Sequence, residues 1–239
     1  MATAHGAAAS RRGEGLPSHH LDDAFLMDYA AGNTTEAVSL LIATHLALCP
    51  MCRARFAEFE SLGGAMLEDL SPTPLGQGAL SAVLARLDSP DDGATIVGPD
   101  PLVIGEPAND EADSAPIPQP LRSYLGRATH ELDWQPVIRG LEEFELDVVG
   151  AKTKLLRIQP GASMPQHTHE GSELTLVLDG SYDDEVGHFA RGDVAVLDDD
   201  HDHRPIAGPG RDCVCLTVID APLRLTGRFG RFLNPFVKF

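Results

Sequence analysis

Apolar side chains recur at three- and four-residue spacing between positions 20 and 88, a pattern typical of amphipathic helices. A first helix is expected over residues 21–29, because Gly32 and Asn33 then interrupt the pattern. The N-capping residues that follow predict a second helix, and Pro50, which is tolerated in a first helical turn, marks the start of a third. A shorter helix over Ala79–Leu87 completes a predicted bundle of about four helices.

In the second half of the chain the apolar period changes from that of a helix to that of a strand, as at 174–178, 194–197 and 214–219. Glycines separate these segments at intervals typical of β-hairpins. The fold class is therefore α+β in two domains: an all-α helical bundle at the N-terminal side and an all-β antiparallel sandwich or barrel at the C-terminal side.

The two patterns are separated by an acidic, proline-rich segment. Between Arg86 and Arg122 there is no basic residue, while eight acidic residues and seven prolines occur there. Charge repulsion and proline stiffness disfavour a packed core in such a segment, so it is interpreted as a linker. The predicted division is a flexible tail at 1–17, a helical domain at 18–88, the linker at 89–120 and the β domain at 121–239.

The net charge limits the kinds of partner. Lys and Arg number 18 against 36 Asp and Glu, for a formal charge of -18, which is the wrong sign for a protein that binds the phosphates of nucleic acid. No apolar run approaches the roughly 18 residues of a membrane span, and no apolar core follows Arg11-Arg12 as a signal peptide would require. We expect a cytoplasmic protein that binds neither nucleic acid nor membrane directly; its oligomeric state stays open.

A histidine and two cysteines form the first candidate metal site. His45, Cys49 and Cys52 lie two turns along one face of a helix that runs through, or nearly through, the proline between the cysteines. One imidazole and two thiolates are three of the four ligands of a tetrahedral zinc site. His20 is the expected fourth ligand, with its neighbour His19 as the alternative. A redox-active pair of cysteines is disfavoured, because that motif follows a strand.

A second candidate site combines two histidines and a glutamate between two glycines. The motif is Gly161-x5-His167-x-His169-x3-Glu173-x6-Gly180, which resembles the first motif of the cupin class of β-barrel. His167 and His169 are two residues apart on a strand and therefore point to one face, and Glu173 comes from the next strand. Three such ligands with one further histidine can hold zinc, iron or manganese.

The fourth cupin ligand comes from a looser second motif. Its spacing from Gly192-Asp193 selects His203, and His201 remains an alternative two residues away. The motif departs from the usual cupin pattern at three positions, which are Asp198, Asp200 and Ala207.

Two further cysteines lie in the β region. Cys213 and Cys215 alternate along a predicted strand and therefore share one face, either as small buried residues or as oxidisable thiols inside the barrel.

The motifs together resemble a known family. The segment from His20 through Asp28-Tyr29-Ala30-Ala31-Gly32, followed by Thr44-His45-Leu46-Ala47-Leu48-Cys49-Pro50-Met51-Cys52-Arg53, resembles the zinc-binding anti-sigma domain. The order of helical zinc domain, linker and cupin is similar to that of the ChrR family of anti-sigma factors.

The resemblance implies a function. The helical domain would bind zinc and sequester an extracytoplasmic-function sigma factor, and the cupin, binding zinc, would promote release in response to singlet oxygen or organic peroxide. The expected protein is a regulator without catalytic residues. The alternative is a cupin metalloenzyme, a dioxygenase or small-molecule lyase using iron or manganese, with a helical appendage.

Overall fold

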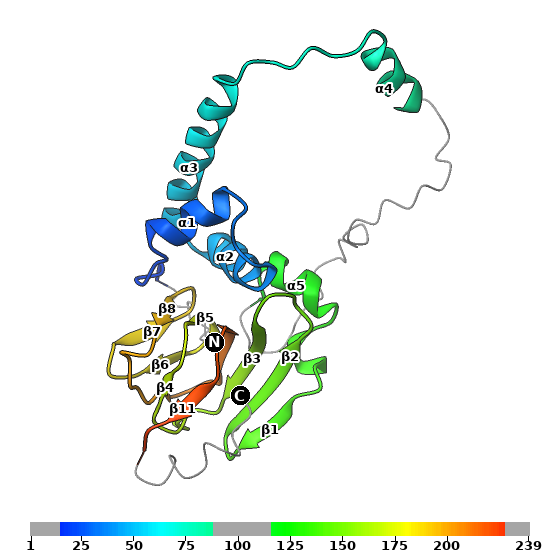
Figure 1. Ribbon diagram of the computed structural model, residues 1–239. Helices are drawn as coiled ribbons and strands as arrows, with labels where there is room; N and C mark the ends of the chain where they lie inside the picture. Colours follow the sequence, from blue (N-terminus) through cyan, green and yellow to red (C-terminus); the bar gives the residue numbers. More distant parts are fainter. Residues whose placement is uncertain (1–14, 88–115, 228–239) are drawn as a thin grey trace, which may run out of the picture.

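The computed structural model describes residues 15–87 and 116–227, and it confirms the predicted change from helices to strands (Figure 1). The N-terminal part contains α1 (Asp23–Ala30), α2 (Glu36–Leu48), α3 (Pro50–Glu68) and α4 (Ala79–Leu87). The predicted tail lies mostly outside the described residues, as does most of the predicted linker.

The break between α2 and α3 differs from the nearly continuous helix that the cysteine spacing suggested. Cys49 has φ -108° and ψ 103°, an extended conformation, and is both the last flanking residue of α2 and the N-cap of α3. The residue before a proline is disfavoured in the helical region, so Pro50 forces the chain out of α2 and then starts α3. The two helices are bent by 119° relative to each other.

A short helix precedes the sheet and was not predicted. α5 (Gln119–Leu125) ends at Gly126, whose φ of 63° is the left-handed conformation of a glycine C-cap. The 3₁₀ turn η1 (Thr129–Glu131) follows. The expected linker boundary at residue 120 therefore falls inside α5, because proline at the first turn begins this helix rather than preventing it.

The C-terminal part is antiparallel throughout, as predicted for the cupin. Its strands are β1 (Gln135–Ile138), β2 (Leu141–Leu146), β3 (Lys152–Ile158), β4 (His167–His169), β5 (Glu173–Asp179), β6 (Ser181–Asp183), β7 (His188–Ala190), β8 (Val194–Leu197), β9 (Ile206–Ala207), β10 (Cys213–Ile219) and β11 (Leu223–Leu225). The largest sheet has the order β1-β2-β3-β10-β5-β8. Two small sheets, β11-β4 and β7-β6-β9, complete the cupin.

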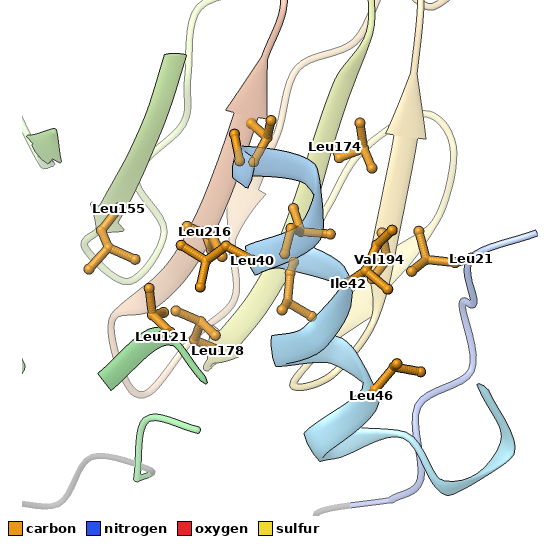
Figure 2. Close-up of a cluster of buried hydrophobic side chains, with 14 of the residues drawn as sticks. Leu21, Leu40, Ile42, Leu46, Leu121, Leu155, Leu174, Leu178, Val194 and Leu216 are labelled. Carbon is orange, nitrogen blue, oxygen red and sulfur yellow. The ribbon is translucent and has the colours of Figure 1, made fainter. Parts of the chain in front are cut away.

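The helices and the large sheet share one hydrophobic core. Alternate residues of β5 and β10, such as Leu176 and Leu216, face α2, while the residues between them, such as Val177 and Cys215, face the cupin interior. Figure 2 shows side chains of α2, of α5 and of the strands meeting in this core. Leu41 of α2 is fully buried there. A buried leucine contributes about 1.5–3 kcal/mol, so α2 is held by the cupin sheet as well as by its helical neighbours.

Candidate metal centres

The four side chains predicted for the helical site are brought together. One potential ligand atom from each of His20, His45, Cys49 and Cys52 lies within 4.8 Å of all the others. The sulfurs of Cys49 and Cys52 are 3.3 and 3.6 Å from Nδ1 of His20. His19, the alternative, lies outside this group: its ring packs on Phe189 of the cupin at a centroid distance of 4.3 Å.

The bend between α2 and α3 creates this geometry. His45 lies in the last turn of α2, Cys49 at the bend and Cys52 in the first turn of α3, where its backbone N–H donates to the sulfur of Cys49 at 3.4 Å. His20 comes from the chain before α1, whose N-cap is Asp22. The bend therefore lets three ligands from two helices face one point, and the chain leading into α1 adds a fourth.

The donor atoms of the helical cluster fit zinc. Nδ1–H of His45 donates to the carbonyl oxygen of Gly192 at 2.8 Å, so Nε2 carries the lone pair. That nitrogen is buried and has no hydrogen-bond partner among the described residues, an arrangement that a metal bond would satisfy. Cys49 and Cys52 are free, buried thiols, and two sulfurs with two imidazoles are a common zinc ligand set.

Burial acts on the charges of this cluster. It lowers the pKa of His45 to about 4, so the imidazole is neutral at pH 7 and available as a ligand. It raises the pKa of Cys52 to about 12, with the neighbouring Cys49 adding to the shift. A thiol in such surroundings is protonated when no cation lies beside it, and a metal ion at this position would favour the thiolate.

The cupin cluster contains three of its predicted ligands. His167, His169 and His203 are buried, with ligand atoms within 4.8 Å of one another. His167 and His203 form an antiparallel bridge, with both backbone hydrogen bonds at 3.0–3.1 Å, which places their rings side by side. His201 lies outside the group, bonded to Asp198 at 2.7 Å with its side chain 40% exposed.

The hydrogen bonds of these rings favour a cation between them. Nδ1–H of His167 donates to the carbonyl oxygen of Pro165 at 2.8 Å, and Nδ1–H of His203 donates to Asp184 at 2.9 Å. Both Nδ1 atoms are thereby held on the outer side, and the two Nε2 atoms face each other at 3.1 Å. Burial lowers the pKa of His167, which favours a neutral ring with its lone pair on Nε2. Inward-facing Nε2 atoms whose Nδ1–H groups are held from behind are the arrangement of metal-binding histidines.

Glu173 is placed differently from the expectation. Its carboxylate is not among the atoms that lie within 4.8 Å of one another. One oxygen lies 3.4 Å from Nδ1 of His169, and the other accepts a hydrogen bond from Thr175 at 2.7 Å. Burial lowers the pKa of His169 to about 4, and the carboxylate opposes that shift. As a metal ligand Glu173 stays a prediction, while its observed contacts are with His169 and Thr175.

The sequence reasoning missed Asp184. Its side chain is fully buried in the turn between β6 and β7, and it holds His203 through a carboxylate–imidazole hydrogen bond. The same carboxylate accepts the backbone N–H groups of Val186 and Gly187. An acidic partner commonly orients a metal-binding histidine, but neither cupin motif includes this position, so only proximity reveals it.

Cys213 and Cys215 lie on the inner face of the cupin, as their alternation on a strand predicted. Both are buried, and their sulfur atoms are 3.6 Å apart. A hydrogen bond with Cys213 and burial raise the pKa of Cys215, so Cys215 is a thiol at neutral pH.

Among the described residues no single helix is long and apolar enough to cross a membrane. Only α2 and α3 taken together pass such a test, and they are sharply bent.

Comparisons with known proteins cover both regions. Residues 124–221 match the family model described as the ChrR cupin-like domain. The chain is 38% identical over 221 residues to the anti-sigma-E factor ChrR of Cereibacter sphaeroides, an alignment that covers 92% of this chain and 98% of that protein. The chain belongs to the ChrR family of anti-sigma factors. The resemblance seen in the sequence is thereby confirmed.

A solved structure of a ChrR protein supports the same arrangement. The anti-sigma ChrR of Rhodobacter sphaeroides, crystallised in complex with SigE, matches with a TM-score of 0.70 and 38% identity. The match covers 84% of this chain and 98% of that one, so helices and cupin are both included.

Proposed function

We propose that this ChrR-family protein binds and inhibits an extracytoplasmic-function sigma factor in the cytoplasm. The observation that carries the proposal is an exposed apolar surface at the end of α3, along the following segment and on α4. We call it the α3–α4 surface, and its residues are Leu62, Met66, Leu67, Leu70, Leu75, Leu80, Val83, Leu84 and Leu87. All are more than half exposed, and α4 has no buried residue.

The apolar side chains of α4 are spaced as in a helix that packs one face against another protein surface. Leu80, Val83, Leu84 and Leu87 have the spacing of one helical face, but none is covered by the described part of this chain. Large apolar side chains left exposed along one helix face mark a protein interface. The relative of known structure was crystallised with a sigma factor, so we infer that a sigma factor covers this surface.

The charge of the helical part supports such a partner. Residues 16–87 contain eight acidic and three basic residues. A sigma factor has a basic surface because it binds DNA, and opposite charge speeds association and favours the correct orientation. This chain would control transcription by covering its partner, without touching DNA itself.

The helical cluster would hold structural zinc. Residues 15–87 offer few buried apolar side chains beyond those of α2, and four metal ligands would fix the bend from which α3 extends. Zinc bound by His20, His45, Cys49 and Cys52 would contribute to folding directly. It would thereby keep the α3–α4 surface in the form that the partner recognises.

The cupin cluster would be the sensor. His167, His169 and His203, with Glu173 beside them, would hold zinc, or iron or manganese, and an oxidant such as singlet oxygen or an organic peroxide would change this site or its two thiols. Oxidation of Cys213 or Cys215 places oxygen atoms in a closed core, which favours a rearranged structure with weaker affinity for the partner. The anti-sigma role of the relative favours this reading over a cupin metalloenzyme.

Co-purification with the sigma factors of the host tests the proposal. The full chain is expected to retain one sigma factor, and replacing both Leu80 and Leu84 with aspartate is expected to abolish retention by burying two charges at the interface. Ile138→Asp is the control, since Ile138 is an exposed apolar residue of the cupin on the outer strand β1. Equal retention by the double variant would show that the α3–α4 surface does not bind the partner.

A further inference from the structure

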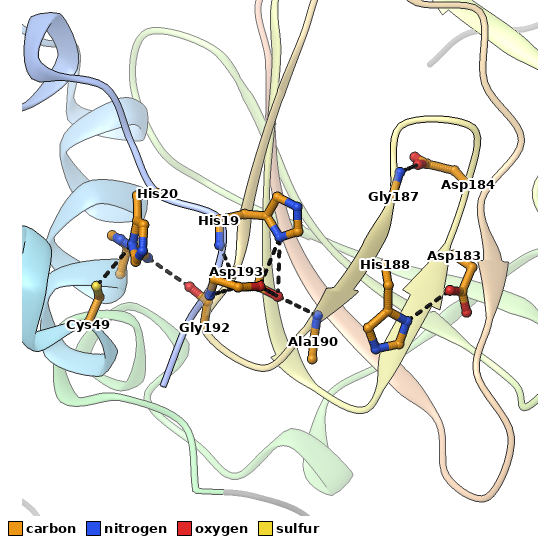
Figure 3. A network of polar contacts seen from close by, with 12 residues as sticks. His19, His20, Cys49, Asp183, Asp184, Gly187, His188, Ala190, Gly192 and Asp193 are labelled. Atoms are coloured by element: carbon orange, nitrogen blue, oxygen red, sulfur yellow. Dashed lines mark hydrogen bonds and ion pairs between the residues drawn. The ribbon is translucent and has the colours of Figure 1, made fainter. Parts of the chain in front are cut away.

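The segment that delivers His20 is bound by a turn of the cupin. One carboxylate oxygen of Asp193 accepts the backbone N–H groups of Ser18 at 2.6 Å and His19 at 2.9 Å. The carbonyl oxygen of His19 accepts the N–H of Val194 at 3.2 Å. Three hydrogen bonds therefore fix the two residues immediately before His20 to the cupin. Figure 3 shows His19 bonded to Asp193.

Asp193 is well placed to hold this segment. Its side chain is 3% exposed, and its second oxygen accepts the N–H of Ala190 at 2.8 Å, which fixes the carboxylate in its own turn. Although burial raises the pKa of Asp193, the three backbone N–H groups lower it overall, so the residue is a carboxylate at neutral pH.

Gly192, in the same turn, reaches the second zinc ligand. Its carbonyl oxygen accepts the Nδ1–H of His45, which lies 147 positions away in the sequence. The φ of Gly192 is +90°, and a Cβ there would lie 2.6 Å from Cγ of Pro17. Only glycine allows this conformation and this close approach, so the turn is shaped to lie against the helical part.

We propose that the cupin turn Ala190–Val194 is a positioning element of the helical zinc site, an inference that rests on the proposed binding of zinc there. It fixes the backbone before His20 and sets the tautomer and orientation of His45. The other two ligands, Cys49 and Cys52, are placed by the bend between α2 and α3. The affinity of the site for zinc is therefore set by both parts of the chain.

This turn also leads to the cupin cluster. The hairpin of β6 and β7 precedes the turn, and at one end of it Asp184 accepts a hydrogen bond from His203. At the other end Phe189 stacks on Tyr182 at 4.9 Å and contacts the ring of His19 at 4.3 Å. Residues 184–194 thus touch the surroundings of both clusters. These contacts join the surroundings of the two clusters directly.

Cobalt(II) bound to the full-length chain in place of zinc is the probe. Only the helical cluster contains cysteines among its ligands, so thiolate-to-cobalt absorption bands report that site and not the histidine cluster. Asp193→Asn keeps the size of the side chain but replaces one acceptor oxygen by a donor amide. Loss of a group that orients a metal ligand lowers affinity by roughly 10- to 100-fold, and we expect an effect at the lower end of that range because Asp193 acts through the backbone.

Two controls separate this effect from general damage. Asp183→Asn makes the same acid-to-amide change at an exposed carboxylate that is bonded to His188, so it is expected to bind cobalt like the wild type. Asp184→Asn changes a buried carboxylate of the same hairpin and is expected to weaken metal binding at the cupin cluster more than at the thiolate site. Gly192→Ala keeps Asp193 and is expected to weaken the thiolate site, which gives a second route to the same result.

The outcomes are distinct. A wild-type chain without thiolate-to-cobalt bands would show that the proposed zinc site is wrong. Wild-type bands with unchanged affinity in both Asp193→Asn and Gly192→Ala would overturn the positioning role alone. Loss of cobalt that accompanies loss of the cupin metal and of the helical circular dichroism signal would also count against it, because general unfolding then explains the effect.

Discussion

The two ligand clusters of this chain differ in chemistry and in construction. The helical cluster combines two thiols and two imidazoles around a break between helices, and a buried nitrogen of His45 points into it without another partner. The cupin cluster consists of imidazoles on strands and a loop, with the outer nitrogens of His167 and His203 held by Pro165 and Asp184. A set of four protein ligands suits structural zinc, whereas three histidines leave room for a further ligand. This difference supports the proposed division into a structural zinc site and a sensor.

The largest effect is expected from Cys49→Ala. Structural zinc contributes roughly 10–16 kcal/mol in small zinc domains, so losing a ligand should remove both the metal and the sigma-binding surface. Metal content per chain and co-purification of the partner measure this. His169→Ala, the matched change in the cupin, is expected to lower metal content but leave partner binding intact. Full partner binding by Cys49→Ala would show that partner binding does not depend on the helical cluster either.

Leu41→Ala tests whether the two regions unfold together. Leu41 is fully buried between α2 and the sheet, and truncating such a leucine costs about 2–5 kcal/mol. We expect one unfolding transition, monitored by helical and near-ultraviolet circular dichroism, to shift as a whole. Leu84→Ala is the control: Leu84 is half exposed on α4, so this variant should leave the unfolding transition unchanged. Two separate transitions, with only the helical one shifted, would show that the parts are independent.

Acid is expected to destabilise the metal-free chain at both clusters. Burial lowers the pKa of His45 and of His169 to about 4, from an ordinary value of 6.5. Between those two pH values the unfolded chain binds the protons, so stability is full above pH 6.5 and falls as the pH drops toward 4. Each imidazole accounts for about 3 kcal/mol.

Urea unfolding of the metal-free chain across this pH range measures the loss. A midpoint that does not change with pH would contradict the burial of neutral imidazoles.

Asp184→Asn should sharpen the comparison with a smaller effect. The acceptor for His203 would then be a neutral amide in place of a carboxylate. The cupin cluster is therefore expected to bind metal roughly 10- to 100-fold more weakly, while partner binding persists. Metal titration monitored by calorimetry checks this. Asp183→Asn is the matched control, since Asp183 is exposed and bonded to His188 instead. Equal weakening by both variants would assign the effect to the hairpin as a whole.

Local patterns were sufficient for most of the fold. Apolar spacing and capping residues predicted α1 to α4, since Thr35 caps α2 as expected, and alternation predicted β5, β8 and β10. α5 was missed because its prolines and its acidic surroundings are those of a linker. It forms because Leu121 and Leu125 are buried against α2, a contact that short-range patterns do not contain.

The ligand positions show the same limit. The spacing of His45, Cys49 and Cys52 predicted that they converge, but the reason is a bend at Cys49 and not a continuous helix face. The choice between His19 and His20, and between His201 and His203, depended on which ring faces the cluster. Neighbours in sequence can point in opposite directions, so only the packed structure separates them.

The fold class, the family and the candidate ligands follow from the sequence, because periodicity and motif spacing are local properties of the chain. The packing of α2 on the cupin sheet, the bond from Asp184 to His203 and the bonds from Gly192 and Asp193 to His45 and His19 come from the folded structure. These contacts join residues far apart in the sequence, and no short-range pattern encodes them. They form because the apolar face of α2 is buried on the strands, which brings the two clusters into one structure.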